Sequence, residues 1–121
     1  MKIIGRYHCP FAAKSGGHAM FAGASSAADG VSIDLRYLNQ LELSDEKNTL
    51  FVGPGNRWGE VYTNLDAFNL TAIGGRVGDV GVGGFLLGGT VMLVYHIEEI
   101  MLTITIRWYL VFITQVGMGR R

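Results

Sequence analysis

The chain has little cysteine and no excess charge, and each of these scarcities excludes a class of protein. Cys9 is the only cysteine among the 121 residues, so no internal disulfide framework can hold the fold. Ten basic residues balance ten acidic ones, which leaves no basic surface that would favour nucleic acid. We therefore expect one domain, or part of one, that depends on a hydrophobic core.

A hydrophobic run long enough to cross a membrane is also missing. Residues 91–112 are strongly apolar, but one histidine and three charged residues interrupt them. A spanning helix needs about 20 consecutive apolar residues. Residues 1–6 carry charge and lack the apolar core of a secretory signal. We expect neither a membrane span nor a targeting segment.

Several familiar functional motifs are absent. No lysine follows a glycine at the spacing of a Walker phosphate loop. The dinucleotide pattern GxGxxG begins with Gly81 and Gly83, but Leu86 stands where its third glycine belongs. The three histidines lie far apart without zinc-like spacing, so we predict no metal site. A Ser-His-Asp hydrolase stays formally open through Ser15 or Ser25, although no GxSxG elbow supports it.

Glycine, in contrast, is abundant, with 18 residues in the chain. Residues 14–18 (KSGGH) place two adjacent glycines directly before a histidine. Adjacent glycines permit positive φ and bring backbone N–H groups close to a ligand such as a phosphate. An imidazole at neutral pH is largely uncharged and nucleophilic. We interpret this first glycine-rich loop as a phosphate site with a nucleophile, His18, beside it.

A second glycine-rich loop covers residues 74–89, where half of the positions are glycine. This density favours neither a helix nor an ordinary strand, because each glycine costs backbone entropy and contributes no side chain. Close approach of the backbone to a ligand would explain the loop, and a tight loop beneath a sheet is the structural alternative. Two such loops could close on a diphosphate from both sides.

Between the loops, the sequence predicts short strands. Residues 9–14 are typical of an extended segment, and residues 31–35 and 70–73 of strands. Two further runs, 41–43 and 49–52, flank five polar residues and predict a hairpin.

One helix is expected after the break at residues 53–55, with Asn56 as its N-cap. Its apolar residues fall on one stripe at helical spacing: Trp58, Val61, Tyr62, Leu65 and Phe68. We interpret this stripe as core packing against a sheet rather than as a cofactor box.

Four blocks of the sequence, in this order and spacing, resemble a known family. They are KSGGHAMFAGASS (14–26), GVSIDLRYLNQ (30–40), GPGNRWGEVYTNL (53–65) and GGRVGDVGVGGFLLGG (74–89). These blocks are similar to the FAD-binding domain of the vanillyl-alcohol oxidase and p-cresol methylhydroxylase type, and within it to the berberine-bridge-enzyme-like oxidases. The resemblance implies an α+β fold: a partial FAD-binding domain of the p-cresol methylhydroxylase type with short strands, one clear helix and two glycine-rich loops.

The resemblance also implies FAD, held in an extended form, as the cofactor. The backbone of Ser15, Gly16 and Gly17 would meet the pyrophosphate, and His18 matches the family histidine that bonds covalently to the 8α-methyl carbon of the flavin. Such a bond raises the oxidising power of the flavin. Some relatives carry a second covalent link through a cysteine at the position of Val77, so one bond is the most that this chain could form. The cofactor-binding positions implied in the second loop are Gly75, Val77, Gly78, Gly81, Val82, Gly83 and Gly84.

By this resemblance the reaction is that of an FAD-linked oxidoreductase. An alcohol, amine or similar carbon centre of a small-molecule substrate would pass hydride to the flavin, and oxygen would reoxidise it. In the family, a separate domain supplies the catalytic base, commonly a tyrosine, so we assign no catalytic residue here. From the charge and the hydropathy we expect no nucleic-acid or membrane partner, and we infer no protein partner.

The resemblance ends at Gly89. We expect a partial FAD-binding domain over residues 1–89 and an apolar tail over residues 90–121 that does not match the family, as in a truncated or frameshifted reading of a longer gene. Residues 102–106 and 108–113 combine high β-propensity with little charge and predict an aggregation-prone edge. The alternative function is a truncated, catalytically inactive fragment with weak or no flavin binding. A further alternative is a glycine-rich interaction module, for which the four blocks would be coincidence.

Overall fold

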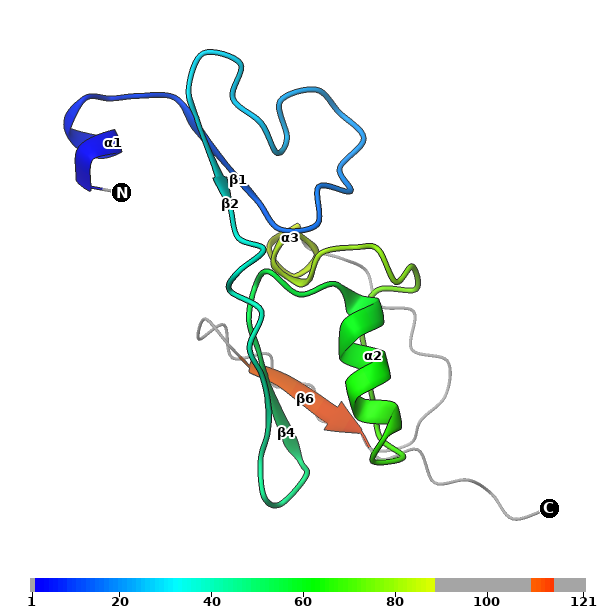
Figure 1. The fold of residues 1–121 in the computed structure, drawn as a ribbon. Helices are drawn as coiled ribbons and strands as arrows, with labels where there is room; N and C mark the ends of the chain where they lie inside the picture. The colour runs from blue at the N-terminus through cyan, green and yellow to red at the C-terminus, as the bar shows by residue number, and fades with distance from the viewer. Residues whose placement is uncertain (1, 89–109, 115–121) are drawn as a thin grey trace.

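The computed structural model describes residues 2–88 and 110–114, whose strands form two small sheets (Figure 1). The first sheet pairs β1 (Phe11–Lys14) with β2 (Val31–Asp34) in parallel. The second is antiparallel, in the order β3 (Leu41–Leu43), β4 (Thr49–Val52), β6 (Leu110–Thr114) and β5 (Thr71–Ala72). The helices of the described part are α1 (Lys2–Arg6), α2 (Trp58–Asp66) and α3 (Val82–Leu87). This mixture of helices and short strands confirms the expected α+β fold.

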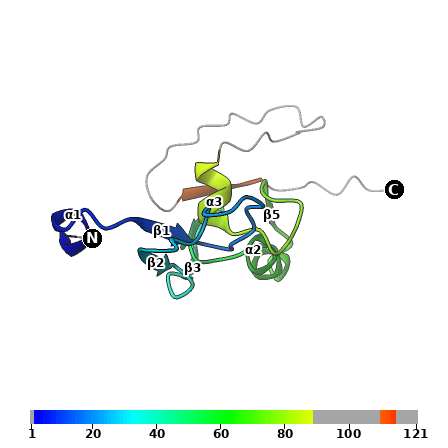
Figure 2. The same cartoon turned by 90° about the horizontal axis from the view of Figure 1, so that it is seen from above.

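Helix α1 stands apart from the other elements. Figures 1 and 2 both show it at the outer end of β1, away from α2 and α3. None of its residues is buried. Since a helix this short gains stability mainly from packing, α1 contributes little to the fold.

The predicted hairpin is confirmed in β3 and β4. Leu41 pairs with Val52, and Leu43 pairs with Leu50, so the turn contains the polar residues between them. Leu50 and Val52 are buried, whereas Phe51 between them is 44% exposed. Because side chains of a strand alternate between its two faces, one face of β4 is turned into the core and the other is not.

Helix α2 packs with strands β4 and β5 of the antiparallel sheet in one hydrophobic core. Trp58, Val61 and Leu65 have no exposed surface and pack with buried residues of β4 and β5. This packing confirms the core interpretation of the apolar stripe. The last member of the stripe differs from the prediction, since α2 ends at Asp66 and Phe68 lies beyond it, 46% exposed.

The N-cap of α2 also differs from the prediction: it is Arg57, not Asn56. The buried side chain of Asn56 donates instead to the carbonyl oxygens of Gln40, at 3.1 Å, and Gly53, at 2.9 Å. The N–H of Arg57 donates to the carboxylate of Glu60 at 2.6 Å, which supplies half of a capping box. The side chain of Asn56 therefore makes hydrogen bonds to other segments instead of capping α2 as local preference had predicted.

Helix α3 shows that the expectation of no helix in the second glycine-rich loop was wrong for residues 82–87. Val82 is buried, and the ring of Phe85 packs edge-on against Trp58 with 5.2 Å between ring centroids. These two anchors offset the poor helix propensity of Gly83 and Gly84 between them.

Strand β6 lies inside the antiparallel sheet, between β4 and β5. Phe112 pairs with Thr49 on one side, and Thr114 pairs with Thr71 on the other. The expectation of an edge strand was therefore wrong for residues 110–113, because both neighbouring strands satisfy the backbone. The rest of that expectation, for residues 102–106 and 108–109, lies outside the described residues. Within the described ranges, no helix has the length and apolar character of a membrane span.

Candidate functional site

The two glycine-rich loops lie against each other. The backbones of Gly16 and Gly81 are so close that a Cβ on either residue would overlap the main chain of the other. The hydroxyl of Ser15 donates to the carbonyl of Pro54 at 2.5 Å and accepts from the N–H of Gly83 at 3.2 Å. Two segments far away in the sequence thereby hold the first loop, which runs out of β1 beside α3 (Figure 1).

Packing explains several glycines of the second loop. A Cβ at Gly74 or Gly75 would overlap the ring of Trp58, and Gly78 lies against Gly59 of α2. These positions fit the tight-loop alternative, in which glycine makes room for protein rather than for a ligand. Gly84 differs, since a Cβ added there would meet no atom of the described residues within 4 Å outside its own helix.

A cavity of about 360 Å³ opens beside the first loop. Its lining residues are Lys14, Gly16, Gly17, Ser25, Ser26, Ser32 and Asp34. Backbone N–H groups next to glycine, hydroxyls and an ammonium are the donors that anionic oxygens accept. A diphosphate therefore fits the chemistry of this cavity.

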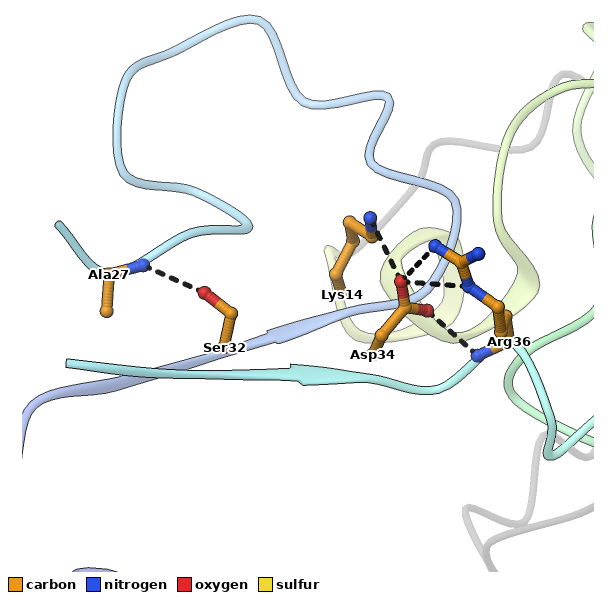
Figure 3. Close-up of polar contacts among 5 residues, drawn as sticks. All are labelled: Lys14, Ala27, Ser32, Asp34 and Arg36. Carbon is orange, nitrogen blue, oxygen red and sulfur yellow. Dashed lines mark hydrogen bonds and ion pairs between the residues drawn. The ribbon is translucent and has the colours of Figure 1, made fainter.

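One carboxylate organises the charged wall of the cavity (Figure 3). Asp34 accepts from the Nζ of Lys14 at 3.1 Å and from two guanidinium nitrogens of Arg36, at 2.6 and 3.0 Å. The backbone N–H of Arg36 adds a fourth contact at 3.1 Å. Side-chain and backbone hydrogen bonds from Arg36, and then the bond from Lys14, hold the pKa of the Asp34 carboxyl well below its usual range.

This lowered pKa predicts how Asp34 responds to acid. A group whose pKa is lower in the folded state stabilises the fold above its ordinary value, here 3.8, and that stabilisation is lost as the pH falls below it. We expect a carbon-13 NMR titration to show no protonation of Asp34 between about pH 7 and about pH 4. A titration midpoint at or above 3.8 would show that the ion pairs do not hold in solution.

The remaining predicted residues lie around this cavity or away from it. His18 is exposed and follows Gly17, whose φ of 73° is in the left-handed region, but it is not part of the cavity lining. Val77 is 51% exposed on the second loop, whereas Val82 is a core residue. Among the described residues, no group of three or more histidine, cysteine or acidic side chains could hold a metal.

Sequence reasoning missed the polar wall formed by Lys14, Ser32 and Asp34. Each of these residues was placed on an expected strand or in the first loop, without a role. The available signal was a lysine and an aspartate on two predicted strands, but nothing in the sequence indicated that these strands pair.

A second cavity, of about 580 Å³, lies along α2 and contains the ion pair of Arg57 with Asp79 at 3.3 Å. Of the predicted cofactor-binding positions, only Gly78 lines it. It therefore does not coincide with the predicted site.

Comparison with known sequences points to flavin proteins. The family model described as the FAD binding domain matches residues 1–105. The FAD-dependent monooxygenase yanF of Aspergillus niger is 45% identical over 112 residues, which cover 92% of this chain and 19% of that protein. The FAD-dependent monooxygenase drtC of Aspergillus calidoustus is 51% identical over 81 residues, covering 67% and 16%. The chain thus spans less than one fifth of the length of these relatives.

Solved structures agree with the sequence relatives. Berberine bridge enzyme in complex with (S)-reticuline has a TM-score of 0.66 and 27% identity over 74% of this chain and 19% of that one. A glycopeptide hexose oxidase complexed with teicoplanin has a TM-score of 0.58 and 32% identity, covering 67% and 16%. The fold is therefore shared with oxidases of different substrates.

Proposed function

Since this chain belongs to the FAD binding domain family, we propose that it is the cofactor-holding part of an enzyme that oxidises an alcohol, amine or similar carbon centre with oxygen as acceptor. Family membership alone makes it an FAD-binding domain of FAD-linked oxidoreductases. When bound, FAD takes two electrons from such a carbon centre and passes them to oxygen. Relatives named as monooxygenases and as oxidases support an oxygen-dependent reaction on a small molecule.

The observation that carries this proposal is the cavity beside the first glycine-rich loop. Gly16 and Gly17 line this cavity, and we assign the diphosphate of FAD to their backbone N–H groups. Ser15 orients the loop, because its hydroxyl is hydrogen-bonded on both sides and is not free for a ligand. Backbone donors held in this way bind an anion without a further loss of conformational entropy.

His18 is the residue to which we assign the covalent bond. Its exposed imidazole leaves the loop directly after Gly17. The imidazole nitrogen would attack the 8α-methyl carbon, and a carbon–nitrogen bond replaces one C–H and one N–H bond. The two protons and two electrons released would pass to oxygen and give hydrogen peroxide, so no further oxidant is needed.

We also assign part of the cofactor space to the surface in front of Gly84. Among the described residues, a Cβ at this position meets no atom within 4 Å outside its own helix. Gly84→Ala is therefore expected to leave the fold intact but to weaken FAD binding by about tenfold, because the methyl group would occupy ligand space. Fluorescence titration with FAD measures this change. Gly5→Ala is the matched control, since Gly5 is also helical and open but lies in α1. Equal affinities for all three proteins would exclude Gly84 from the site.

The titration of the unaltered chain tests the proposal as a whole. Saturable FAD binding is the expected result. We expect no hydrogen peroxide release with an alcohol or amine from this chain by itself, because it contains no residue that we assign as catalytic. A folded chain that binds no FAD would favour the alternative of an inactive fragment.

A further inference from the structure

The parallel register of the first sheet places three polar residues on one face. Ser32 is opposite Ala12, and Asp34 is opposite Lys14. Because side chains alternate along a strand, Lys14, Ser32 and Asp34 project to the same side. Figure 3 shows them directed toward the loop that connects the two strands. This face of the sheet is therefore the polar wall of the cavity.

Two cations, Lys14 and Arg36, contact the carboxylate of Asp34, so these three side chains together carry a net charge of +1. The guanidinium and the backbone N–H of Arg36 both donate hydrogen bonds to the carboxylate of Asp34. An ammonium has three donors, and Asp34 accepts one from Lys14, so two are left for another acceptor. The Lys14 side chain is 37% exposed and lines the cavity, whereas Arg36 does not line it.

Serine hydroxyls complete the cavity on the side of the connecting loop. Ser25 and Ser26 line it, and no residue of the described ranges hydrogen-bonds their hydroxyls. Ser32 accepts from the N–H of Ala27 at 3.4 Å, which ties this loop back to the sheet. The cavity thus combines one cation with uncommitted donors, the combination that suits a phosphate.

We propose that Lys14 binds the diphosphate of FAD and that Asp34 is its positioning residue. This inference rests on the proposed function of the same site. Asp34 holds the ammonium at the cavity wall and keeps it there before the ligand arrives. The pair therefore reduces the entropy lost on binding, although the carboxylate itself repels an anion.

The charge of Lys14 is tested with Lys14→Gln. We expect FAD affinity to fall about tenfold, inorganic pyrophosphate to compete less well with FAD, and the salt dependence of binding to become weaker. Lys14→Arg should restore most of the affinity because it keeps the charge. Lys47→Gln is the matched control, since it removes the same charge from the exposed hairpin turn.

Asp34→Asn separates positioning from simple charge. Removing a carboxylate beside an anion site would tighten binding if only net charge mattered, whereas loss of positioning weakens it. We expect FAD affinity to fall by about threefold or more. Circular dichroism of each variant confirms that it is folded.

These measurements distinguish the role of Lys14 and Asp34 from the proposed function as a whole. Unchanged FAD affinity and pyrophosphate competition in folded Lys14→Gln would overturn the inference and leave the proposed function standing. Tighter binding by Asp34→Asn would overturn its positioning role. If the unaltered chain binds neither FAD nor pyrophosphate, the proposed function fails as well.

Discussion

Replacing His18 by alanine is expected to remove all flavin that stays with the protein after acid precipitation. The imidazole is the nucleophile that we assign to the covalent bond, and alanine offers no atom that could replace it. The exposed position of His18 means that the substitution should leave the fold intact. The measurement is flavin fluorescence of the washed, acid-precipitated protein after incubation with FAD in the presence of oxygen.

His8→Asn provides the control for this experiment. His8 is also exposed, and its φ of 51° is tolerated by asparagine. This variant should keep its full complement of covalent flavin. Acid-stable flavin in His18→Ala would eliminate His18 as the tether. If the unaltered protein also contains no acid-stable flavin, the chain binds FAD only non-covalently.

Gly81→Ala is expected to destabilise the fold by about 3 kcal/mol, because its Cβ would overlap the backbone of Gly16 and the hydroxyl of Ser15. The two glycine-rich loops would have to move apart, and this movement would break the hydrogen bond from the N–H of Gly83 to the hydroxyl of Ser15. Urea unfolding monitored by circular dichroism measures the difference in free energy of unfolding.

Gly84→Ala is the matched control for stability, three residues further along. Its Cβ would contact no described residue outside its own helix, and alanine in a helix is more favourable than glycine by about 0.5–1 kcal/mol. Opposite signs for the two substitutions are therefore expected. Similar effects on unfolding would mean that the contact between Gly16 and Gly81 does not form in solution.

The hairpin, the core stripe and the FAD site differ in how far the sequence could predict them. The two short runs around the polar turn at residues 44–48 and the helical spacing of Trp58, Val61 and Leu65 are local patterns, and the structure contains both elements where they were expected. FAD as the cofactor was also predicted, through the resemblance of the four blocks, and the family match confirms it. The individual cofactor-binding residues stay predictions.

The second glycine-rich loop shows where local reasoning fails. A high glycine content indicates close approach but not to what, and here Trp58, Gly59 and Gly16 are the neighbours of many of these glycines. The same loop contains α3, because Val82 and Phe85 reach a core that local propensity does not describe.

The hairpin and helix α2 could be predicted from the sequence, because their patterns act over a few residues, and the order of the four blocks indicated the family. Tertiary structure alone decided which segments meet. It paired Lys14 with Asp34 across a parallel sheet and placed residues 110–114 between β4 and β5. It also directed the side chain of Asn56 to the carbonyl of Gln40 instead of to the N-terminus of α2. Each of these choices depends on contacts between residues distant in the chain, whose free energy no local pattern contains.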